Sequence, residues 1–248
     1  MKAQFNRHLF TQTNVDSGAL TLHGMVIHTF REPGEYQVAL LWNNETIRRF
    51  PLIVDDQAET MQVNIDLAAL HRPGTQHTEE YMLKPGGSAV FHVGRGTGGY
   101  AVIATRLGEP QPHEGHGKRP ERAATPMPFD SRELREGDMF AVTLLRPGVY
   151  SLTNNTVRAK GNLVVTYPKP RGRHEAAPEP VTVECTEKGF VPERVELQPF
   201  QGLLFRVSAP SRIRIDLVKP DDGPEGPRSP GLTGWRKPKV AQREKRSK

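Results

Sequence analysis

The chain has 248 residues, enough for one large domain or two ordinary domains that each bury a core. Only 35% of the residues are hydrophobic, and 23 Gly and 22 Pro indicate many turns and linkers. The single cysteine, Cys185, excludes a disulfide framework and a zinc site of the Cys₄ or Cys₂His₂ type. We interpret Cys185 as a small buried apolar residue.

The N-terminal segment does not have the pattern of a secretory signal. Residues 1–10 lack the apolar core of a secretory signal, and no apolar run is long enough to span a bilayer. These absences favour an intracellular protein or a component of a particle, and they leave the compartment itself unknown.

The net charge of +6 is concentrated at the C-terminal end. Residues 226–248 contain eight Lys and Arg residues against one Glu, a net charge of +7, which leaves about −1 for the first 225 residues. The basic character therefore belongs to the tail and not to the part of the chain that we expect to fold.

Three segments share one pattern: a glycine-marked turn, an alternating apolar run, a second glycine turn, a tyrosine and another apolar run. They cover residues 22–42, 83–105 and 134–152, and a degenerate fourth copy covers 195–217. The alternation predicts half-buried strands, and the glycines predict hairpin turns between them. Each tyrosine (Tyr36, Tyr100, Tyr150) is expected to bury its ring and bond nearby backbone, like the tyrosine corner of β-sandwiches.

Three other stretches lack this pattern. Residues 108–129 are rich in Pro, His and charge and predict a linker, and 168–180 have a similar composition and predict a second linker or a long loop. Residues 65–71 predict one or two helical turns. The sequence therefore predicts an all-β fold, with a β-sandwich module over 1–107, a Pro/Gly-rich linker over 108–125, a second module over 126–219 and an extended basic tail over 220–248.

Parts of the second module resemble a cupredoxin-type domain. Residues 181–207, with the Phe-Val-Pro segment at 190–192, resemble its opening strands, and residues 146–150 and 160–165 resemble its closing strands. The closing strands precede the opening ones, an order that two successive half-repeats would produce. The resemblance implies sandwich modules of the cupredoxin-like or immunoglobulin-like kind.

The same resemblance implies that a copper site is lacking. A type 1 copper site needs a thiolate and two imidazoles, but the loop at 153–159 contains no His, Cys or Met, and Cys185 lies elsewhere. We therefore predict no copper and no other cofactor.

No arrangement of side chains in the sequence matches a known active site, so we predict no enzymatic activity. His113 and His116 are weak candidates for metal ligands, and a solvated linker is the favoured interpretation of both. His23, His28 and His92 lie on predicted strands. The glycine-rich segment at 94–99 lacks the following helix of a phosphate-binding loop, so we expect a hairpin loop there.

The basic tail is the strongest candidate for a binding segment. Its cations and one aromatic residue could neutralise phosphates and stack on a base or an apolar surface, whereas the alternative is a solubilising end. The candidate partner- or polyanion-binding residues are Arg228, Trp235, Arg236, Lys237, Lys239, Arg243, Lys245, Arg246 and Lys248.

These observations predict a non-enzymatic structural or interaction protein, such as an accessory or coat-type subunit of a larger assembly. Its partners would be other protein subunits, with nucleic acid or another polyanion bound by the tail. One alternative is a cupredoxin-like ligand- or metal-binding module with histidines on one sheet. Another is a carbohydrate-binding sandwich. This alternative is disfavoured because the chain has only two tryptophans, Trp42 and Trp235.

Overall fold

The computed structural model describes residues 12–72, 80–108, 128–167 and 178–221. The described part of the chain is almost entirely β-structure, which confirms the predicted all-β class. The N-terminal elements are β1 (Asn14–Asp16), β2 (Gly24–Phe30), β3 (Gly34–Trp42), β4 (Glu45–Val54), β5 (Gln62–Asp66), α2 (Leu67–Leu70), β6 (Tyr81–Leu83), β7 (Gly87–His92) and β8 (Tyr100–Arg106). The C-terminal elements are β9 (Phe129–Asp130), β10 (Met139–Thr143), β11 (Gly148–Asn154), β12 (Ala159–Val165), β13 (Val181–Thr186), β14 (Gly189–Val191), β15 (Arg194–Leu197), β16 (Gly202–Val207) and β17 (Ile213–Pro220).

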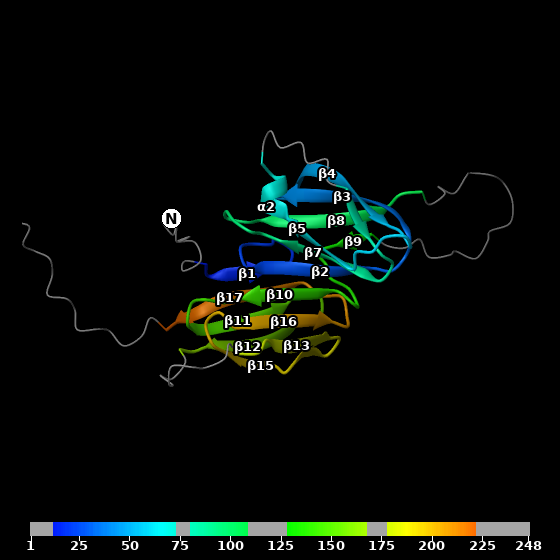
Figure 1. Cartoon of the computed structure of the whole chain (residues 1–248). Helices are drawn as coiled ribbons and strands as arrows, with labels where there is room; N and C mark the ends of the chain where they lie inside the picture. Colours follow the sequence, from blue (N-terminus) through cyan, green and yellow to red (C-terminus); the bar gives the residue numbers. More distant parts are fainter. Residues whose placement is uncertain (1–11, 73–79, 109–127, 168–177, 222–248) are drawn as a thin grey trace, which may run out of the picture.

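The strands form three sheets, and one of them runs through both halves of the molecule. A seven-stranded sheet has the order β14-β13-β16-β10-β2-β7-β5. The sheet β6-β4-β3-β8-β9 covers its N-terminal half, and β1-β17-β11-β12-β15 covers its C-terminal half. Figure 1 shows the two halves one above the other, with β2 and β10 side by side at their boundary.

The two halves have the same topology. In the N-terminal half, β2 pairs with β7 in the seven-stranded sheet, and β3 pairs with β4 and β8 in the covering sheet. In the C-terminal half, β10 pairs with β16 in the seven-stranded sheet, and β11 pairs with β12 and β17 in the covering sheet. The parallel pairs β4–β6 and β5–β7 likewise match β12–β15 and β13–β16. The fold is therefore an internal duplication.

The duplication has a constant offset of 114 residues over much of its length. Residues 14–38 match 128–152 without a gap, and 83–93 match 197–207. The identical pairs in the first stretch are Asp16/Asp130, Ser17/Ser131, Leu20/Leu134, Met25/Met139, Thr29/Thr143, Pro33/Pro147, Gly34/Gly148 and Tyr36/Tyr150.

The halves are related by a pseudo-twofold axis that passes through the β2–β10 ladder. Val26 pairs with Phe140, and these two residues are each other's equivalents. The equivalent pairs Met25–Ala141 and Ile27–Met139 lie on either side. Val26 and Phe140 are both fully buried, so the axis passes through the core.

The predicted hairpins are wrong at the repeated segments. The two strands of each copy lie in different sheets, as β2 and β3 do, so the connection crosses the core instead of turning back. The segment at 94–99, also predicted to be a hairpin loop, joins β7 to β8 in the same way. Each sheet buries one face only, and sending successive strands to facing sheets lets the two apolar faces cover each other. A true hairpin joins β3 to β4 through Asn43 and Asn44, which have the positive φ values (51° and 67°) of a tight turn.

The predicted tyrosine corner is confirmed at two of three positions. The Tyr36 hydroxyl donates to the Glu32 carbonyl at 2.9 Å, and the Tyr150 hydroxyl donates to the Arg146 carbonyl at 2.6 Å. At Tyr100 only the burial of the ring is confirmed, because its hydroxyl lies 2.9 Å from His71 Nδ1 and not from a backbone group. Tyr100 begins β8, which is not the equivalent of β3 or β11, so no matching turn precedes it.

Each half also contributes a strand to the other half. β1 precedes the N-terminal half but pairs with β17, and β9 precedes the C-terminal half but pairs with β8. The two serines after these strands close equivalent hydrogen bonds: Ser17 Oγ accepts from the Ile213 amide at 3.0 Å and Ser131 Oγ from the Val102 amide at 2.9 Å. The exchange means that neither half completes its outer sheet without the other.

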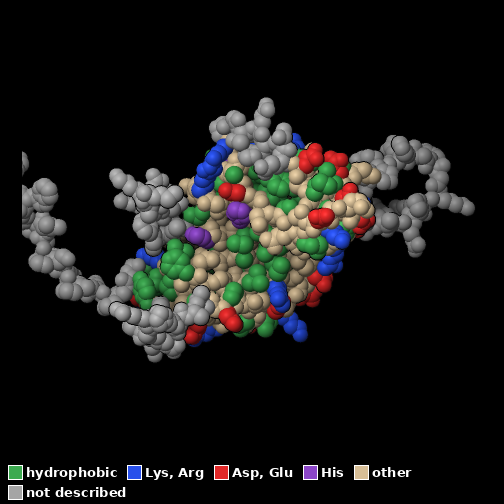
Figure 2. All heavy atoms as spheres, in the orientation of Figure 1, with side chains coloured by type: hydrophobic (Ala, Val, Ile, Leu, Met, Phe, Trp, Pro, Cys, Tyr) green, Lys and Arg blue, Asp and Glu red, His purple; other side chains and the backbone are tan. Residues whose placement is uncertain are grey.

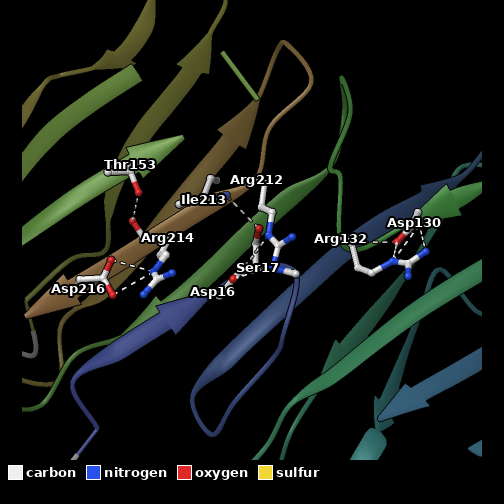
Figure 3. A network of polar contacts seen from close by, with 10 residues as sticks. Asp16, Ser17, Asp130, Arg132, Thr153, Arg212, Ile213, Arg214 and Asp216 are labelled. Carbon is white, nitrogen blue, oxygen red and sulfur yellow. Dashed lines mark hydrogen bonds and ion pairs between the residues drawn. The ribbon is translucent and has the colours of Figure 1, made fainter. Parts of the chain in front are cut away.

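An aspartate–arginine pair is present at both exchanged strands but is built differently (Figure 3). Asp16 accepts from Arg212, at 3.2 Å from Nε and 2.9 Å from an Nη nitrogen, whereas Asp130 accepts from Arg132 two residues later. The equivalent of Arg132 is Gly18, and a side chain there would start 2.9 Å from Arg212 Nε. The bond to Asp16 raises the pKa of Arg212, so the guanidinium stays charged.

The remaining sequence-based elements are simple to place. The helical turns predicted at 65–71 are confirmed as α2, whose first turn is capped by Asp66 accepting from the Ala68 amide at 3.0 Å. No helix among the described residues is long and apolar enough to cross a membrane. The predicted module boundaries stay a prediction, and most of the predicted linker lies outside the described residues.

The duplication predicts a compensating pair of substitutions. The residue equivalent to Arg212 in the other half is Ala101. Gly18→Arg combined with Arg212→Ala therefore gives Asp16 an arginine partner two residues later, as Asp130 has in Arg132. Arg212→Ala alone should lower the free energy of unfolding by about 1 kcal/mol, because two charge-assisted bonds at a partly exposed site are lost. The double variant should recover most of this loss in urea denaturation. A loss in the double variant equal to the sum of the single losses would contradict the equivalence.

Candidate functional site

Most of the residues predicted to bind a partner or a metal lie outside the described part of the chain. This applies to His113, His116 and to all nine tail residues, Arg228, Trp235, Arg236, Lys237, Lys239, Arg243, Lys245, Arg246 and Lys248. The structure therefore neither brings them together nor separates them. The candidate site is built from described residues alone.

The two ends of the β2–β10 ladder should be alike because the pseudo-twofold axis relates them, but their chemistry differs. At one end the last pair is Gly24–Val142. One position beyond the Met139–Ile27 pair at the other end, His28 and Asp138 face each other. His28 is the equivalent of Val142, and Asp138 is the equivalent of Gly24. We name these the charged end and the apolar end.

The charged end is centred on a histidine–aspartate pair. His28 Nδ1 lies 2.6 Å from Asp138 Oδ1, and the Asp138 side chain is only 4% exposed. Asp138 Oδ2 accepts from the Arg135 amide at 2.8 Å, so both carboxylate oxygens have partners. The imidazole stacks on Phe129, with 4.2 Å between ring centroids, and meets Phe30 edge-on at 4.7 Å. A fixed Nδ1 leaves Nε2 as the nitrogen available for other contacts.

A cavity of about 250 Å³ opens beside this pair. Its wall combines aromatic rings with charged groups from both halves of the molecule. The lining includes His28, Phe30, Arg31, Glu32, Tyr36, Arg106, Phe129, Asp130, Glu133, Arg135, Glu136 and Asp138. Arg106 is already engaged, because it donates to Glu32 at 2.8 Å and to the Pro33 carbonyl at 2.6 Å.

The apolar end replaces most of these groups by an uncharged residue, but Glu32 and Asp130 correspond to the charged Arg146 and Asp16. The equivalents of His28, Arg31, Arg106, Phe129, Glu133 and Glu136 are Val142, Leu145, Leu217, Val15, Ala19 and Leu22. Figure 2 shows the same contrast at the surface, with acidic and basic side chains toward the right-hand end and a hydrophobic area at the left of the lower half.

Four exposed hydrophobic side chains surround the apolar end. They are close to the point where β10, β12 and β15 end and β11 and β16 begin. Their exposed fractions are 38% for Val149, 60% for Tyr167, 69% for Phe200 and 66% for Val218. Exposed apolar side chains also lie beside the charged end, as Leu107 (44%) and Met61 (54%) do, so the two exposed aromatic residues, Tyr167 and Phe200, are what distinguish the apolar end.

Phe200 has an unusual backbone conformation. Its φ is 68°, and its equivalent in the other half is Gly86, with φ 83°. The turns match in detail: the Phe200 amide donates to the Leu144 carbonyl at 3.0 Å, as the Gly86 amide donates to the Phe30 carbonyl at 2.7 Å. A bulky residue in the left-handed region is strained, and glycine is not.

His23 is a second such residue at the apolar end. Its φ is 66°, its equivalent is Gly137 with φ 90°, and its carbonyl accepts from the Thr143 amide at 3.2 Å. His23 Nε2 is buried with no hydrogen-bond partner in the described structure, and burial lowers the pKa of its imidazole. The left-handed residues of the apolar end thus flank the last two residues of β10.

The single cysteine is unreactive in this fold, and the described residues form no metal-binding cluster. Cys185 is fully buried on β13, and burial raises the pKa of its thiol to about 12, so the thiolate that would react is absent near neutral pH. No three His, Cys, Asp or Glu side chains in the described ranges gather to hold a metal ion. The site can therefore bind and orient groups through hydrogen bonds, charge and aromatic contact.

The segments that resemble a cupredoxin lie together in the C-terminal half. Residues 146–150 and 160–165 lie at β11 and on β12, and 181–207 form β13 to β16. The loop at 153–159, which lacks copper ligands, is the β11–β12 hairpin. Trp42 is 38% exposed and contacts His71, with 4.9 Å between ring centroids.

No protein-family model matches the chain, and no curated protein or solved structure gives a significant match. The resemblance to cupredoxin-type domains therefore stays a prediction, and the internal comparison of the two halves takes the place of a comparison with relatives.

Sequence analysis missed the residues at both ends. His28 was noted only as a histidine on a predicted strand, and Asp138 and Phe200 were not singled out. The signal that could have found them is the 114-residue offset, because aligning the halves places Asp138 against Gly24 and Phe200 against Gly86.

The charged end generates a prediction about stability. Asp138→Ala should lower the free energy of unfolding by about 2–3 kcal/mol, because it leaves the Arg135 amide and the imidazole without an acceptor. The combination His28→Val with Asp138→Gly introduces the residues of the apolar end and should cost less than the two single changes together. Urea denaturation measures both, with the exposed carboxylate variant Asp56→Ala as the control. Equal losses for Asp138→Ala and the control would contradict the role of the pair.

Proposed function

We propose that this protein is a non-enzymatic structural or interaction protein, an accessory or coat-type subunit of a larger assembly. The apolar end docks on a partner protein. The basic tail provides a second attachment, to the partner or to a polyanion.

The observation that carries this proposal is the exposed, strained Phe200. A side chain in a disfavoured backbone region costs about 1–3 kcal/mol and persists only where something compensates for it. The equivalent turn forms with Gly86, so the fold does not need a phenylalanine there. Because 69% of its surface is exposed, the Phe200 side chain contributes little packing energy to the stability of its own chain. The compensation is therefore best supplied by a partner.

The turn holds Phe200 rigidly in place. The Gln198 amide donates to the Gln201 side chain at 2.9 Å, and the Gln201 amide donates back to the Gln198 carbonyl at 3.1 Å. The Gln201 side-chain nitrogen also donates to the Glu179 carbonyl at 2.6 Å. These bonds fix the backbone of the turn, so less conformational entropy of the backbone is lost when Phe200 binds, which favours its use as an anchor.

The surroundings of Phe200 suit the same role. Tyr167, Val149 and Val218 extend the apolar surface, and the half-exposed Leu145 lies next to Leu144, which accepts the Phe200 amide. An aromatic anchor surrounded by smaller apolar contacts is the usual composition of an interface core.

The basic tail supports the second part of the proposal through its charge. β17 ends at Pro220, and the Asp221 amide donates to the Pro147 carbonyl at 3.0 Å, so the tail begins beside the apolar end. Eight cations following this point would attract an acidic partner or a polyanion to the same interface.

The first test is Phe200→Gly, which copies the turn of the other half. We expect the free energy of unfolding to stay equal or rise by up to about 1 kcal/mol, because the backbone strain is relieved. We also expect binding to the partner to weaken about 30-fold, the effect of losing a hot spot of about 2 kcal/mol. Urea denaturation and sedimentation of the native complex from the source cells measure the two effects.

The matched control is Val191→Ala, which removes an exposed apolar side chain from the edge strand β14, where it is 57% exposed. It should leave the sedimentation of the complex unchanged. If Phe200→Gly preserves the complex as this control does, the proposed docking role of the apolar end is wrong.

The second test is the deletion of residues 226–248. Binding should be salt-sensitive in the full chain, because the cations of residues 226–248 release counterions from an anionic partner. Binding should be lost or strongly weakened in the truncated chain, which lacks these cations. Pull-down of the intact and truncated proteins at low and high salt, with identification of the bound molecules, measures this. Unchanged assembly after truncation would remove the role of the tail.

A further inference from the structure

We infer that the partner of the apolar end is the charged end of a second copy of this chain, so that copies associate head to tail. This inference rests on the proposed function and names its partner. Four observations support it: the opposite placement of the two ends, the size of the cavity, its aromatic lining and the charges around it.

The apolar end and the charged end lie at the two ends of the β2–β10 ladder. The ladder ends with the pair Gly24–Val142 at the apolar end and with the pair Met139–Ile27 at the charged end. A contact between unlike ends of two copies is heterologous, and it leaves one apolar and one charged end free for further copies. Such an association gives a ring or an open filament, depending on the rotation between copies, and either form suits a coat component.

The cavity at the charged end fits a single aromatic side chain. Its volume of about 250 Å³ is below the range of roughly 300–1,000 Å³ of pockets that enclose drug-sized ligands. Phe30, Tyr36, Phe129 and His28 all contribute to its lining; Phe30 and Phe129 are buried behind it, and the half-buried Tyr36 and His28 are the accessible rings. Aromatic rings favour edge-to-face or offset contacts with another ring, so the phenyl group of Phe200 matches this lining.

The charges of the two ends complement each other. The cavity lining carries five carboxylates against three guanidinium groups. In the described part of the chain, neither Glu133 nor Glu136 has a hydrogen-bond or ion-pair partner for its carboxylate. The tail, residues 220–248, has eight cations and four anions, and three of the anions (Asp221, Asp222 and Glu225) come first, so its net charge is +4 and its cations lie in residues 226–248. Contact of the ends would bring this charge to Glu133 and Glu136 of the second copy.

The test places a photoreactive benzoylphenylalanine at position 200 of the full chain. The purified protein is irradiated at low salt, about 50 mM, where charge screening is weak. We expect covalent dimers and longer products, with cross-links from position 200 mapped by mass spectrometry to residues 28–36 or 128–138 of another copy.

Two variants in the same photoreactive chain test the charges. Glu133→Lys with Glu136→Lys should reduce the cross-linked product about tenfold, because repulsion replaces attraction. Glu187→Lys with Glu193→Lys makes the same change in charge at two exposed positions of the C-terminal half and should leave the yield unchanged.

The absence of cross-linked copies in the purified protein, or cross-links to a different surface of the second copy, would overturn the head-to-tail inference. Equal yields from the two lysine variants would also overturn it. If Phe200→Gly still disrupts the native complex in those cases, the proposed function stands with another protein as the partner. If Phe200→Gly has no effect there either, both proposals fail.

Discussion

The β2–β10 ladder is the contact on which the rest of the structure depends. It joins two half-sheets into one seven-stranded sheet, and its central pair, Val26 and Phe140, is fully buried between the covering sheets. Because the ladder is antiparallel and its central residues are equivalents, it generates the pseudo-twofold axis of the molecule. The exchanged strands β1 and β9 then follow from the same axis, each completing the outer sheet of the opposite half. The two halves therefore need each other to bury their cores.

The duplication makes departures from symmetry informative. Positions that serve the fold keep their residue in both halves, as the tyrosine corners and the serines after the exchanged strands do. The aspartates also keep an arginine partner, although it comes from a different position in each half. The differences gather instead at the two ends of the ladder. There a buried Asp138 replaces a glycine, and an exposed Phe200 stands where glycine suffices, and the proposed docking role rests on this asymmetry.

Several structural features could be predicted from particular residues. Alternating apolar positions such as Ala89, Phe91 and Val93 identified strands, since a period of two places side chains on one face. The Pro-Gly-x-Tyr pattern identified the corners at Tyr36 and Tyr150. The pattern failed at Tyr100 and at the hairpins, because turn residues show that the chain bends but not which sheet receives the next strand. His28 and Asp138 are 110 residues apart, so no local pattern could join them.

The sequence by itself determined the all-β class, the repeated strand pattern, the concentration of positive charge in residues 226–248 and the absence of copper ligands at 153–159. These are properties of composition and of short-range periodicity. Only the tertiary structure decided that the halves share a sheet, exchange strands and differ at their ends. Those features depend on the register of β2 against β10, and that register is set by burying Val26 and Phe140 together, two residues that are 114 positions apart in the sequence.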